Sequence, residues 1–284
     1  MKVLLTGANG QLGRCFQDRV PAGWKVWATD TSVLDITNRD NVLAAVDKYQ
    51  PNVIINAAAY TAVDKAESSL QDANLVNNVG PENLAIAAKK CSAVFIHVST
   101  DYVFDGFSAT PYVETDKTNP LSVYGKTKLD GETTVANVYP DTIIIRTAWV
   151  FSEYGNNFVK TMLRLGKEKT SLGVVADQRG CPTYAGDIAH AIIKLIENNT
   201  GGGIYHFCGD KEVSWYEFAE TIFEVANNSG AINSRPIVKP IKTEEYPTPA
   251  PRPSYSTLNC TKIKHAGVTP SPWEQALIDI IHKL

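Results

Sequence analysis

The chain has 284 residues, of which 44% are hydrophobic and 20% are charged, and its formal net charge is −3. This composition is typical of a globular protein and excludes the disordered, collagen-like and disulfide-scaffold classes. The slight acidic excess argues against a nucleic-acid partner, which would require clustered Lys and Arg. At roughly 100–200 residues per domain, the length predicts two domains or one large α/β unit.

The cysteines and histidines indicate neither a crosslinked scaffold nor a metal site. The five cysteines are odd in number and widely spaced, with no CxxC pair, and the five histidines form no HxxxH cluster. The apolar start of the chain is too short for a signal peptide, and no run reaches the ~18 apolar residues of a membrane span. We therefore expect a cytoplasmic protein with no membrane partner and no metal.

In the first half, short β-branched runs alternate with helical patterns. Strands are predicted at Lys2–Thr6, Lys25–Thr29, Val53–Asn56, Val94–Val98 and Thr142–Arg146. Helices are predicted near Gln11–Arg19, Arg39–Tyr49, Gln71–Lys90 and Val123–Asn137. Several of these strands are apolar at every position, as expected where both faces of a parallel sheet are buried. The alternating order predicts an α/β fold, a Rossmann-like doubly wound parallel sheet with right-handed crossovers.

Weaker patterns continue through the second half. Strands are predicted near Leu172–Val175 and Ile204–Cys208, and helices near Ala185–Glu197, Trp215–Ala226 and Trp273–His282. Six prolines between Pro236 and Pro253 bar a regular helix or a central strand from that segment. We expect residues 1–150 to form a dinucleotide-binding Rossmann domain, to which some later segments return. Residues 151–284 are expected to form mainly a small, discontinuous substrate-binding lobe.

A glycine-rich turn follows the first predicted strand. Thr6–Gly13 has the spacing GxxGxxG, which lets the backbone approach a pyrophosphate at the start of a helix, although a purely structural turn has the same pattern. Asp30 ends the second predicted strand, where a carboxylate takes ribose hydroxyls. Asp30 favours the free 2′-hydroxyl of NADH, whereas Thr31 and Ser32 can donate hydrogen bonds to a 2′-phosphate. We therefore expect NADPH or NADH as cofactor.

Small residues follow the third predicted strand in the run Asn56-Ala57-Ala58-Ala59-Tyr60-Thr61. Such residues at the carboxyl edge of a sheet permit the close approach of a flat ligand. They equally ease the packing of a helix on a strand. The segment alone does not decide between these two interpretations.

Tyr124 and Lys128 are one helical turn apart and face the same way. They begin the helix after the fourth predicted strand, which ends at Val98-Ser99-Thr100-Asp101-Tyr102. A phenol titrates near ~10, and an adjacent ammonium is expected to lower that value towards working pH, which would make Tyr124 a proton donor. Thr100 is expected to hydrogen-bond a carbonyl oxygen as charge develops there. A surface Tyr–Lys pair is the alternative.

These residues resemble an extended short-chain dehydrogenase/reductase and, more narrowly, the dTDP-4-dehydrorhamnose reductase family. The glycine and Tyr/Lys motifs mark only the superfamily, whereas STDYVFDG, RTAWVF and GNNFV are far more specific. The resemblance runs through the whole chain, in Gly7–Gly13, Asn56–Glu67, Asn77–Leu84, Ser99–Gly106, Val123–Glu132, Arg146–Phe151, Gly155–Leu165, Asp177–Thr183 and Arg252-Pro253.

The resemblance implies a role for each matching position. Pyrophosphate contacts would come from Gly10, Gln11 and Leu12, in the turn that begins at Gly7. Asp30 would bind the adenosine ribose, Asp35 and Ile36 would border the adenine, and Ala59, Tyr60, Thr61 and Val98 would line the nicotinamide side. Thr100, Tyr124 and Lys128 would be the catalytic set, with Tyr124 and Lys128 also touching the cofactor. Substrate contacts would come from Thr100, Asp101, Trp149 and Arg252.

The residue after Asp101 distinguishes reactions within the superfamily. Related sugar-nucleotide dehydratases have Ser-Thr-Asp-Glu at this strand end, where the Asp/Glu pair performs the elimination, whereas this chain has Tyr102. The sequence therefore favours reduction. By resemblance, the reaction is reduction of the C4 carbonyl of dTDP-4-dehydro-β-L-rhamnose to dTDP-β-L-rhamnose, with a dTDP-linked deoxysugar as partner.

Other interpretations stay open at this point. Relatives with this fold serve as non-catalytic regulatory subunits of methionine adenosyltransferase, and another nucleotide-linked 4-keto sugar is a further possible substrate. Metal-assisted dimerisation in some relatives relies on acidic residues near the first helix, where Cys15 stands in this chain. We therefore transfer no metal, and we expect a monomer or a homodimer.

Overall fold

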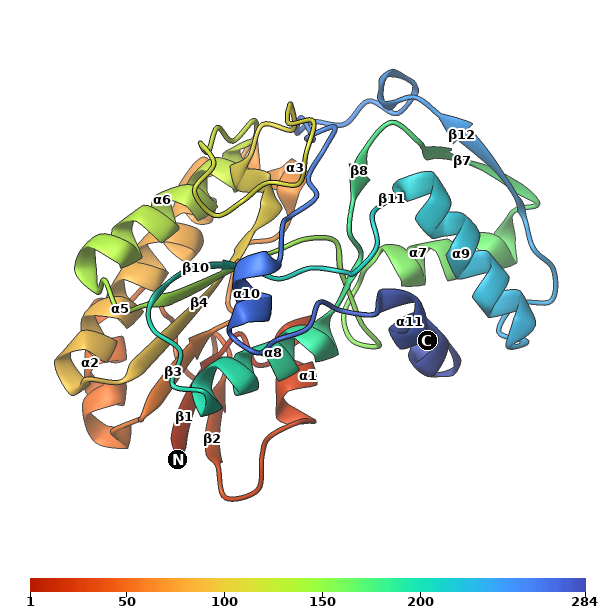
Figure 1. The fold of residues 1–284 in the computed structure, drawn as a ribbon. Coiled ribbons are helices and arrows are strands. Elements are labelled where there is room, and N and C mark those ends of the chain that lie inside the picture. The colour runs from red at the N-terminus through yellow and green to blue at the C-terminus, as the bar shows by residue number, and fades with distance from the viewer.

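The computed structural model describes residues 1–284. Its larger part is built on one six-stranded sheet in which every neighbouring pair is parallel (Figure 1). In sheet order the strands are β10 (Gly203–His206), β5 (Ile143–Thr147), β4 (Val94–Thr100), β3 (Val53–Asn56), β1 (Lys2–Thr6) and β2 (Lys25–Thr29). The predicted parallel α/β sheet is confirmed. β4 extends two residues beyond its predicted end, as far as Thr100.

Helices cover both faces of this sheet, because alternate residues of the strands are apolar on both sides. Leu4, Ile54 and Phe95 pack in one cluster with residues of α2 (Arg39–Tyr49), α5 (Gly80–Cys91) and α6 (Val123–Val138). Val3, Ile55 and Ile96 belong to a second cluster on the other face, with residues of α1 (Gln11–Gln17) and α8 (Ala185–Glu197). The sheet is therefore wound with helices on both faces, as its sequence pattern predicts.

The single helix predicted over Gln71–Lys90 is wrong in detail. The structure has a short α4 (Leu70–Asn74), a π-helical turn at Leu75–Val79 and then α5. The π turn directs Asn77 into the molecule, where its side chain accepts from the Tyr60 N–H at 2.8 Å and donates to the Thr127 hydroxyl at 3.1 Å. The carbonyl of Asn77 occupies the place of a Cβ on Gly131, so α6 lies unusually close to this turn.

Most of the remaining elements form a smaller part beside the sheet (Figure 1). There, β12 (Ile237–Ile241) pairs with β7 (Ser171–Val175) in a two-stranded parallel sheet, so the proline-containing strand is not a central one. The other elements of this part are β6 (Val150–Phe151), α7 (Phe158–Glu168), β8 (Arg179–Gly180), β9 (Thr183–Tyr184), β11 (Val213–Ser214), α9 (Trp215–Asn228) and α11 (Trp273–Ile280). In contrast, α3 (Val63–Ala66) packs with α6 and α10 (Thr261–His265) with β10, so both lie with the large sheet (Figure 1).

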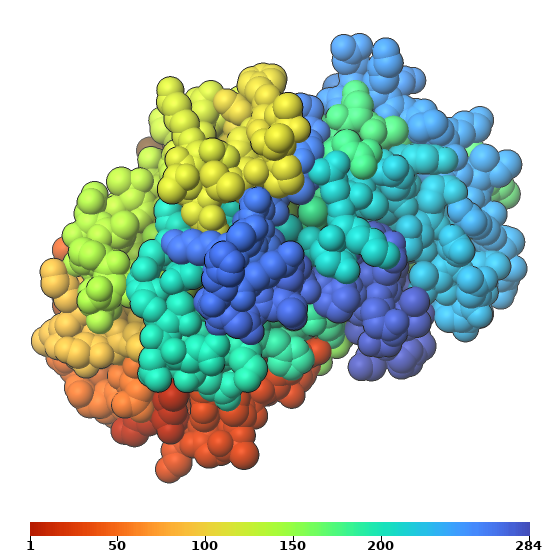
Figure 2. All heavy atoms as spheres, viewed as in Figure 1, coloured from red at the N-terminus to blue at the C-terminus, as the bar shows by residue number.

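The chain crosses between these two parts several times. β10 joins the large sheet beside β5, and isolated bridges link Tyr112 to Leu258 and Arg179 to Tyr255. Figure 2 shows the C-terminal segment, in blue, lying against both the yellow and green surface and the cyan surface. No helix of the structure is both long enough and apolar enough to cross a membrane.

A buried ion pair ties the helical layer to the sheet. The Arg146 guanidinium of β5 donates to the Glu132 carboxylate of α6 at 2.7 and 2.9 Å, and both side chains are 3% exposed. The guanidinium also lies over the Phe104 ring, and its Nη1 is 3.4 Å from Nε2 of His206. Burial and this cation lower the pKa of His206 to about 3, so His206 stays neutral.

Replacing Arg146 by Met should lower the free energy of unfolding by about 3–5 kcal/mol, because Glu132 would be left as an unpaired buried charge. Urea unfolding followed by circular dichroism measures this. The matched control is Arg164→Met in the exposed pair with Glu168, where the change should stay within about 0.5 kcal/mol. Equal losses in the two variants would contradict a special role for the buried pair.

Candidate active site

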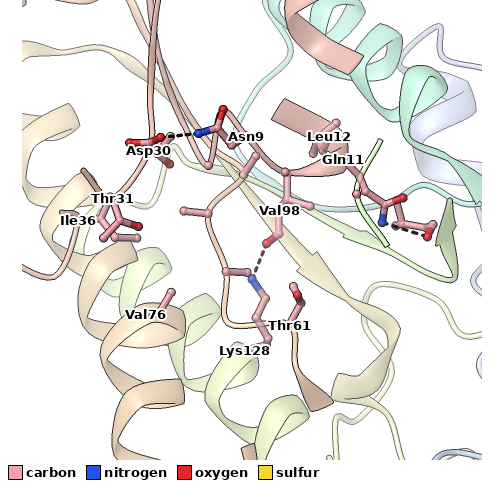
Figure 3. A pocket seen from close by; sticks show the side chains of 18 of the residues that line it. Asn9, Gln11, Leu12, Asp30, Thr31, Ile36, Thr61, Val76, Val98 and Lys128 are labelled. Atoms are coloured by element: carbon pink, nitrogen blue, oxygen red, sulfur yellow. Dashed lines mark hydrogen bonds between the residues drawn. The ribbon is translucent and has the colours of Figure 1, made fainter. Parts of the chain in front are cut away.

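A cavity of about 610 Å³ opens at the carboxyl ends of the parallel strands (Figure 3). Ligands of doubly wound sheets bind at this edge. Of the residues proposed from the sequence, it is lined by Gly7, Gly10, Gln11, Leu12, Asp30, Asp35, Ile36, Ala59, Thr61, Val98, Tyr124 and Lys128. Five others proposed there, Tyr60, Thr100, Asp101, Trp149 and Arg252, do not line it.

The glycine turn leaves the backbone bare at the floor of the cavity. Gly7 has φ of +70°, and a Cβ there would lie 2.6 Å from the backbone of Ala57 and Ala58. A Cβ on Gly13 would likewise collide with the Gly7 carbonyl. No side chain caps the first turn of α1, so its free N–H groups face the lining at Gly10–Leu12. This arrangement suits the pyrophosphate of a dinucleotide.

Gln11 links the turn to the second half of the chain. Its Oε1 accepts from Asn157 Nδ2 at 2.9 Å and from the Ser152 hydroxyl at 3.0 Å, and its Nε2 donates to the Val150 carbonyl at 3.4 Å. The 150–157 segment is thereby held against the cavity.

Asp30 lies at the opposite end of the cavity, just after β2. Its carboxylate accepts from Asn9 Nδ2, from the Ser32 hydroxyl at 2.6 Å and from the Ser32 N–H at 2.9 Å. The hydrogen bond from the Ser32 hydroxyl is the main reason that the pKa of Asp30 falls below its usual value. Asp30 is therefore an oriented, ionised acceptor, as recognition of a ribose requires. Asp35, farther along, accepts from the N–H and hydroxyl of Thr37 at 2.9 and 2.8 Å.

Lys128 contributes a buried cation to the wall of the cavity. The residue is 2% exposed, and its Nζ donates to the Val98 carbonyl at 2.6 Å (Figure 3). Burial lowers the pKa of Lys128 to about 8, and Glu132, one turn further on, partly opposes that shift. The ammonium is therefore largely protonated at neutral pH.

The expected effect of Lys128 on Tyr124 is wrong. Burial raises the pKa of Tyr124 to about 12, a hydrogen bond with Thr100 lowers it, and the charge of Asp101 raises it. Lys128 is not among the causes of this shift. Tyr124 is therefore protonated at neutral pH in the free protein, although its raised pKa makes the phenol a weaker acid there.

Thr100 ends β4 beneath Tyr124 and points towards the next residue. Its hydroxyl donates to Oδ1 of Asp101 at 2.9 Å and accepts from the Tyr102 N–H at 3.2 Å. Asp101 is 2% exposed, its Oδ2 has no partner, and burial raises its pKa to about 6. In the protein without ligands, the hydroxyl of Thr100 therefore donates its hydrogen to the Asp101 carboxylate.

Trp149 and Arg252 lie outside the main cavity, and each makes specific contacts with other side chains. Trp149 has φ of +49° and stacks on Trp215 of α9, with ring centroids 3.5 Å apart and an interplanar angle of 5°. Arg252 forms an ion pair with Asp64 of α3, from Nη2 to Oδ2 at 3.0 Å, and also bonds Thr248 and the Ala250 carbonyl. The Arg252 guanidinium is thus already paired, so a pyrophosphate could engage it only by competing with Asp64.

Several lining residues escaped the sequence analysis. They include Asn9, Leu34, Thr37, Val76, Thr147, Val150, Gly155, Asn156 and Ile188. Asn9 lies within the glycine turn, between Gly7 and Gly10, and that position could have indicated a contact with the cavity. The GNNFV motif at Gly155 marked the family but not a contact with the cavity.

A parallel sheet with a glycine turn, an oriented carboxylate after β2 and a Tyr/Lys pair on the helix after β4 defines a nicotinamide-dependent oxidoreductase of the short-chain dehydrogenase/reductase class. Comparisons with known proteins narrow the class. The family model described as RmlD substrate binding domain matches residues 1–284. A curated dTDP-4-dehydrorhamnose reductase from Aggregatibacter actinomycetemcomitans is 50% identical, over 98% of both chains.

Two solved structures agree with this match. The dTDP-4-dehydrorhamnose reductase of Clostridium acetobutylicum has a TM-score of 0.94 and 43% identity over 99% of both chains. That of Bacillus anthracis, solved in complex with NADP, has a TM-score of 0.94 and 39% identity, over 100% of this chain and 99% of that one. The chain belongs to the dTDP-4-dehydrorhamnose reductase family.

Replacing Asp30 by Ala should weaken NADH binding by roughly tenfold, because a charge-assisted acceptor for the ribose hydroxyls is lost. NADPH binding should be unchanged or tighter, since the carboxylate no longer repels the 2′-phosphate. Fluorescence titration of each reduced nicotinamide measures both constants. Asp40→Asn on exposed α2 is the control. Equal weakening of both cofactors would contradict a role of Asp30 at the 2′-position.

Proposed function

We propose that this protein reduces the C4 carbonyl of dTDP-4-dehydro-β-L-rhamnose to give dTDP-β-L-rhamnose, with NADPH or NADH as reductant. The observation that carries the proposal is that Tyr124 and Lys128 line the same cavity as the glycine turn and Asp30. A proton donor and a dinucleotide site therefore share one space. Membership of a family whose curated relatives carry this name supplies the substrate.

The cavity fits a dinucleotide along its whole length. The bare backbone at Gly10, Gln11 and Leu12 would take the pyrophosphate, and Asp30 the ribose, while Asp35 and Ile36 border the adenine. Ala59, Thr61 and Val98 would lie against the nicotinamide. The bound cofactor supplies the hydride. Tyr60 would support this end through its backbone, which Asn77 binds on both the N–H and the carbonyl.

Residues of the chain supply the proton that the C4 oxygen takes during reduction. Tyr124 is protonated at neutral pH, and it would donate that proton to the C4 oxygen as negative charge develops there. The Lys128 cation stabilises negative charge on this side of the cavity and would hold the nicotinamide ribose. Thr100 would orient the phenol of Tyr124.

The smaller part of the chain would hold the sugar nucleotide together with two residues of the first 150, Asp101 and Trp149. Asp101 and Trp149 would contact the deoxysugar, and Arg252 the nucleotide diphosphate. In this division residues 1–150 bind the cofactor, with β10 and α8 returning to the sheet, and residues 151–284 mainly bind the substrate. The Trp149–Trp215 stack joins the segment after β5 to α9, so the two parts meet there.

Reduction fits this site better than dehydration. Tyr102 occupies the position after Asp101, and its ring packs edge-on against Tyr124 with centroids 5.5 Å apart. The second carboxylate that an elimination needs is therefore absent from this strand end. We further propose that the protein works in the cytoplasm as a monomer or homodimer; its five unpaired cysteines suit a reducing compartment.

The Tyr124→Phe variant should lose about 100- to 10,000-fold in kcat, because the proton donor is removed while the ring stays in place. Nicotinamide absorbance, followed with the dTDP-4-keto sugar, measures the rate. Cofactor affinity, measured by fluorescence, should stay close to that of the unaltered protein. Wild-type turnover in this variant would contradict the mechanism.

The substrate is tested separately by offering the UDP- and GDP-linked 4-keto sugars beside the dTDP form. A higher kcat/KM for the dTDP-linked sugar supports the proposal. A higher kcat/KM for the UDP- or GDP-linked sugar would instead identify that sugar as the substrate. Absence of turnover with all three, together with co-purification of a methionine adenosyltransferase, would favour a regulatory subunit instead.

A further inference from the structure

One face of the Trp149 ring is covered by a second indole. Trp215 lies parallel to it, with ring centroids 3.5 Å apart and an interplanar angle of 5°. A centroid separation equal to van der Waals contact leaves almost no lateral offset, so one ring eclipses the other. Aromatic pairs prefer an offset or edge-on geometry to this arrangement. Contacts around the two indoles must therefore hold them together.

Trp215 is fixed independently of Trp149. It is the first residue of α9, where a capping box closes the start of the helix. The N–H of Glu217 donates to Ser214 Oγ at 3.1 Å, and the N–H of Ser214 donates to the Glu217 carboxylate at 2.6 Å. The Phe158 ring of α7 packs against Trp215 with centroids 4.7 Å apart. Trp215 thus belongs to the aromatic core of the smaller part and presents a fixed surface to Trp149.

Trp149, in contrast, lies between β5 and β6 with a strained backbone. Its φ of +49° is in the left-handed region, which a bulky residue rarely adopts and which persists only where neighbouring contacts enforce it. A Cβ on Gly180 would lie 2.7 Å from Cε2 and Nε1 of Trp149, so one edge of the indole rests on a bare glycine. No aromatic ring other than Trp215 packs on this partly buried side chain, so its opposite face can receive a ligand.

The chemistry of that face suits a sugar ring. A pyranose presents a face of C–H groups, which gains dispersion contacts and buries apolar area when it lies on an indole. An indole that is already held in its bound orientation does not have to be ordered by the ligand, so more of the contact free energy contributes to affinity.

We propose that Trp215 is a positioning residue for sugar binding: it holds the Trp149 indole so that the uncovered face receives the C–H face of the deoxysugar. The inference rests on the proposed function, in which Trp149 contacts the sugar. Trp215 itself does not touch the sugar, because Trp149 lies between them. The stack is therefore part of the site before the substrate arrives and stays in place when it binds.

Trp215→Ala removes the supporting ring and should raise the KM for the dTDP-4-keto sugar by roughly 3- to 10-fold, as expected for the loss of an aromatic pair. The kcat, followed by nicotinamide absorbance, should stay within about twofold, because Trp149 supports the ground and transition states alike. Binding of dTDP, measured by calorimetry, should be unchanged, since dTDP lacks the sugar. Tyr216→Ala, the next aromatic residue of α9, is the matched control and should leave the KM unchanged.

Three measurements keep the test independent of how well Trp215→Ala folds. Trp215→Phe retains a flat ring and should return the KM to within about twofold of the wild-type value. In a Trp149→Ala background, Trp215→Ala should raise the KM no further, because the ring that it positions is gone. Two stacked indoles couple their electronic transitions, so the wild-type protein should show an exciton couplet in far-UV circular dichroism. That couplet should persist when dTDP-β-L-rhamnose binds.

The outcomes separate the positioning role from the proposed function. An unchanged KM in Trp215→Ala, or equal weakening of dTDP and dTDP-β-L-rhamnose binding, would overturn the positioning role and leave the stack as a packing contact. Loss of the couplet on binding of dTDP-β-L-rhamnose would also overturn it, because Trp215 would then move away from Trp149. Wild-type protein that fails to reduce the dTDP-4-keto sugar would overturn the proposed function, and the positioning role with it.

Discussion

The buried charge of Lys128 is the constraint on which this site depends. An ammonium that is 2% exposed is costly, and it is compensated by the Val98 carbonyl at 2.6 Å and by Glu132 one helical turn away. Glu132 is in turn paired with Arg146 of β5, which lies beside the neutral His206 of β10. This series of buried contacts joins α6 to three neighbouring strands. The rotation of α6, and with it the position of Tyr124, is therefore set by electrostatics as much as by apolar packing.

Close backbone approach is the second requirement, because α6 must reach the sheet edge for these contacts to form. A Cβ on Gly125 would collide with the Tyr102 carbonyl, and one on Gly131 with the Asn77 carbonyl. Glycine at both positions lets one helix lie against the segment after β4 and against the π turn. At this turn the Asn77 side chain points inward and binds both backbone groups of Tyr60. Asn77, in the helical segment before α5, thus fixes the backbone of the loop after β3.

The sequence predicted the sheet well and the site in part, for physical reasons. β1, β2, β3 and α2 have the predicted bounds, since apolar runs between turn residues depend on local pattern. The π turn was missed because it arises from contact between Asn77 and α6, which are distant in sequence. The Tyr124–Lys128 spacing predicted a shared face correctly. The direction of the Tyr124 pKa shift was wrong, since the spacing of two residues does not reveal how deeply the phenol is buried.

The proline-rich segment shows how little regular structure a site component needs. Residues 250–260 return to the large sheet through contacts spaced along an extended backbone: Arg252 with Asp64, the Ser254 hydroxyl with the Gly106 carbonyl at 2.9 Å, and Ser256 with Asp101. Proline restricts φ, so such a segment loses less conformational entropy on ordering than a flexible one. Gly106 has φ of +82°, and a Cβ there would lie 2.7 Å from Pro253, so this contact is close at the backbone. The same prolines that prevent a central strand therefore hold the segment extended, and this places Ser256 beside the carboxyl group of Asp101.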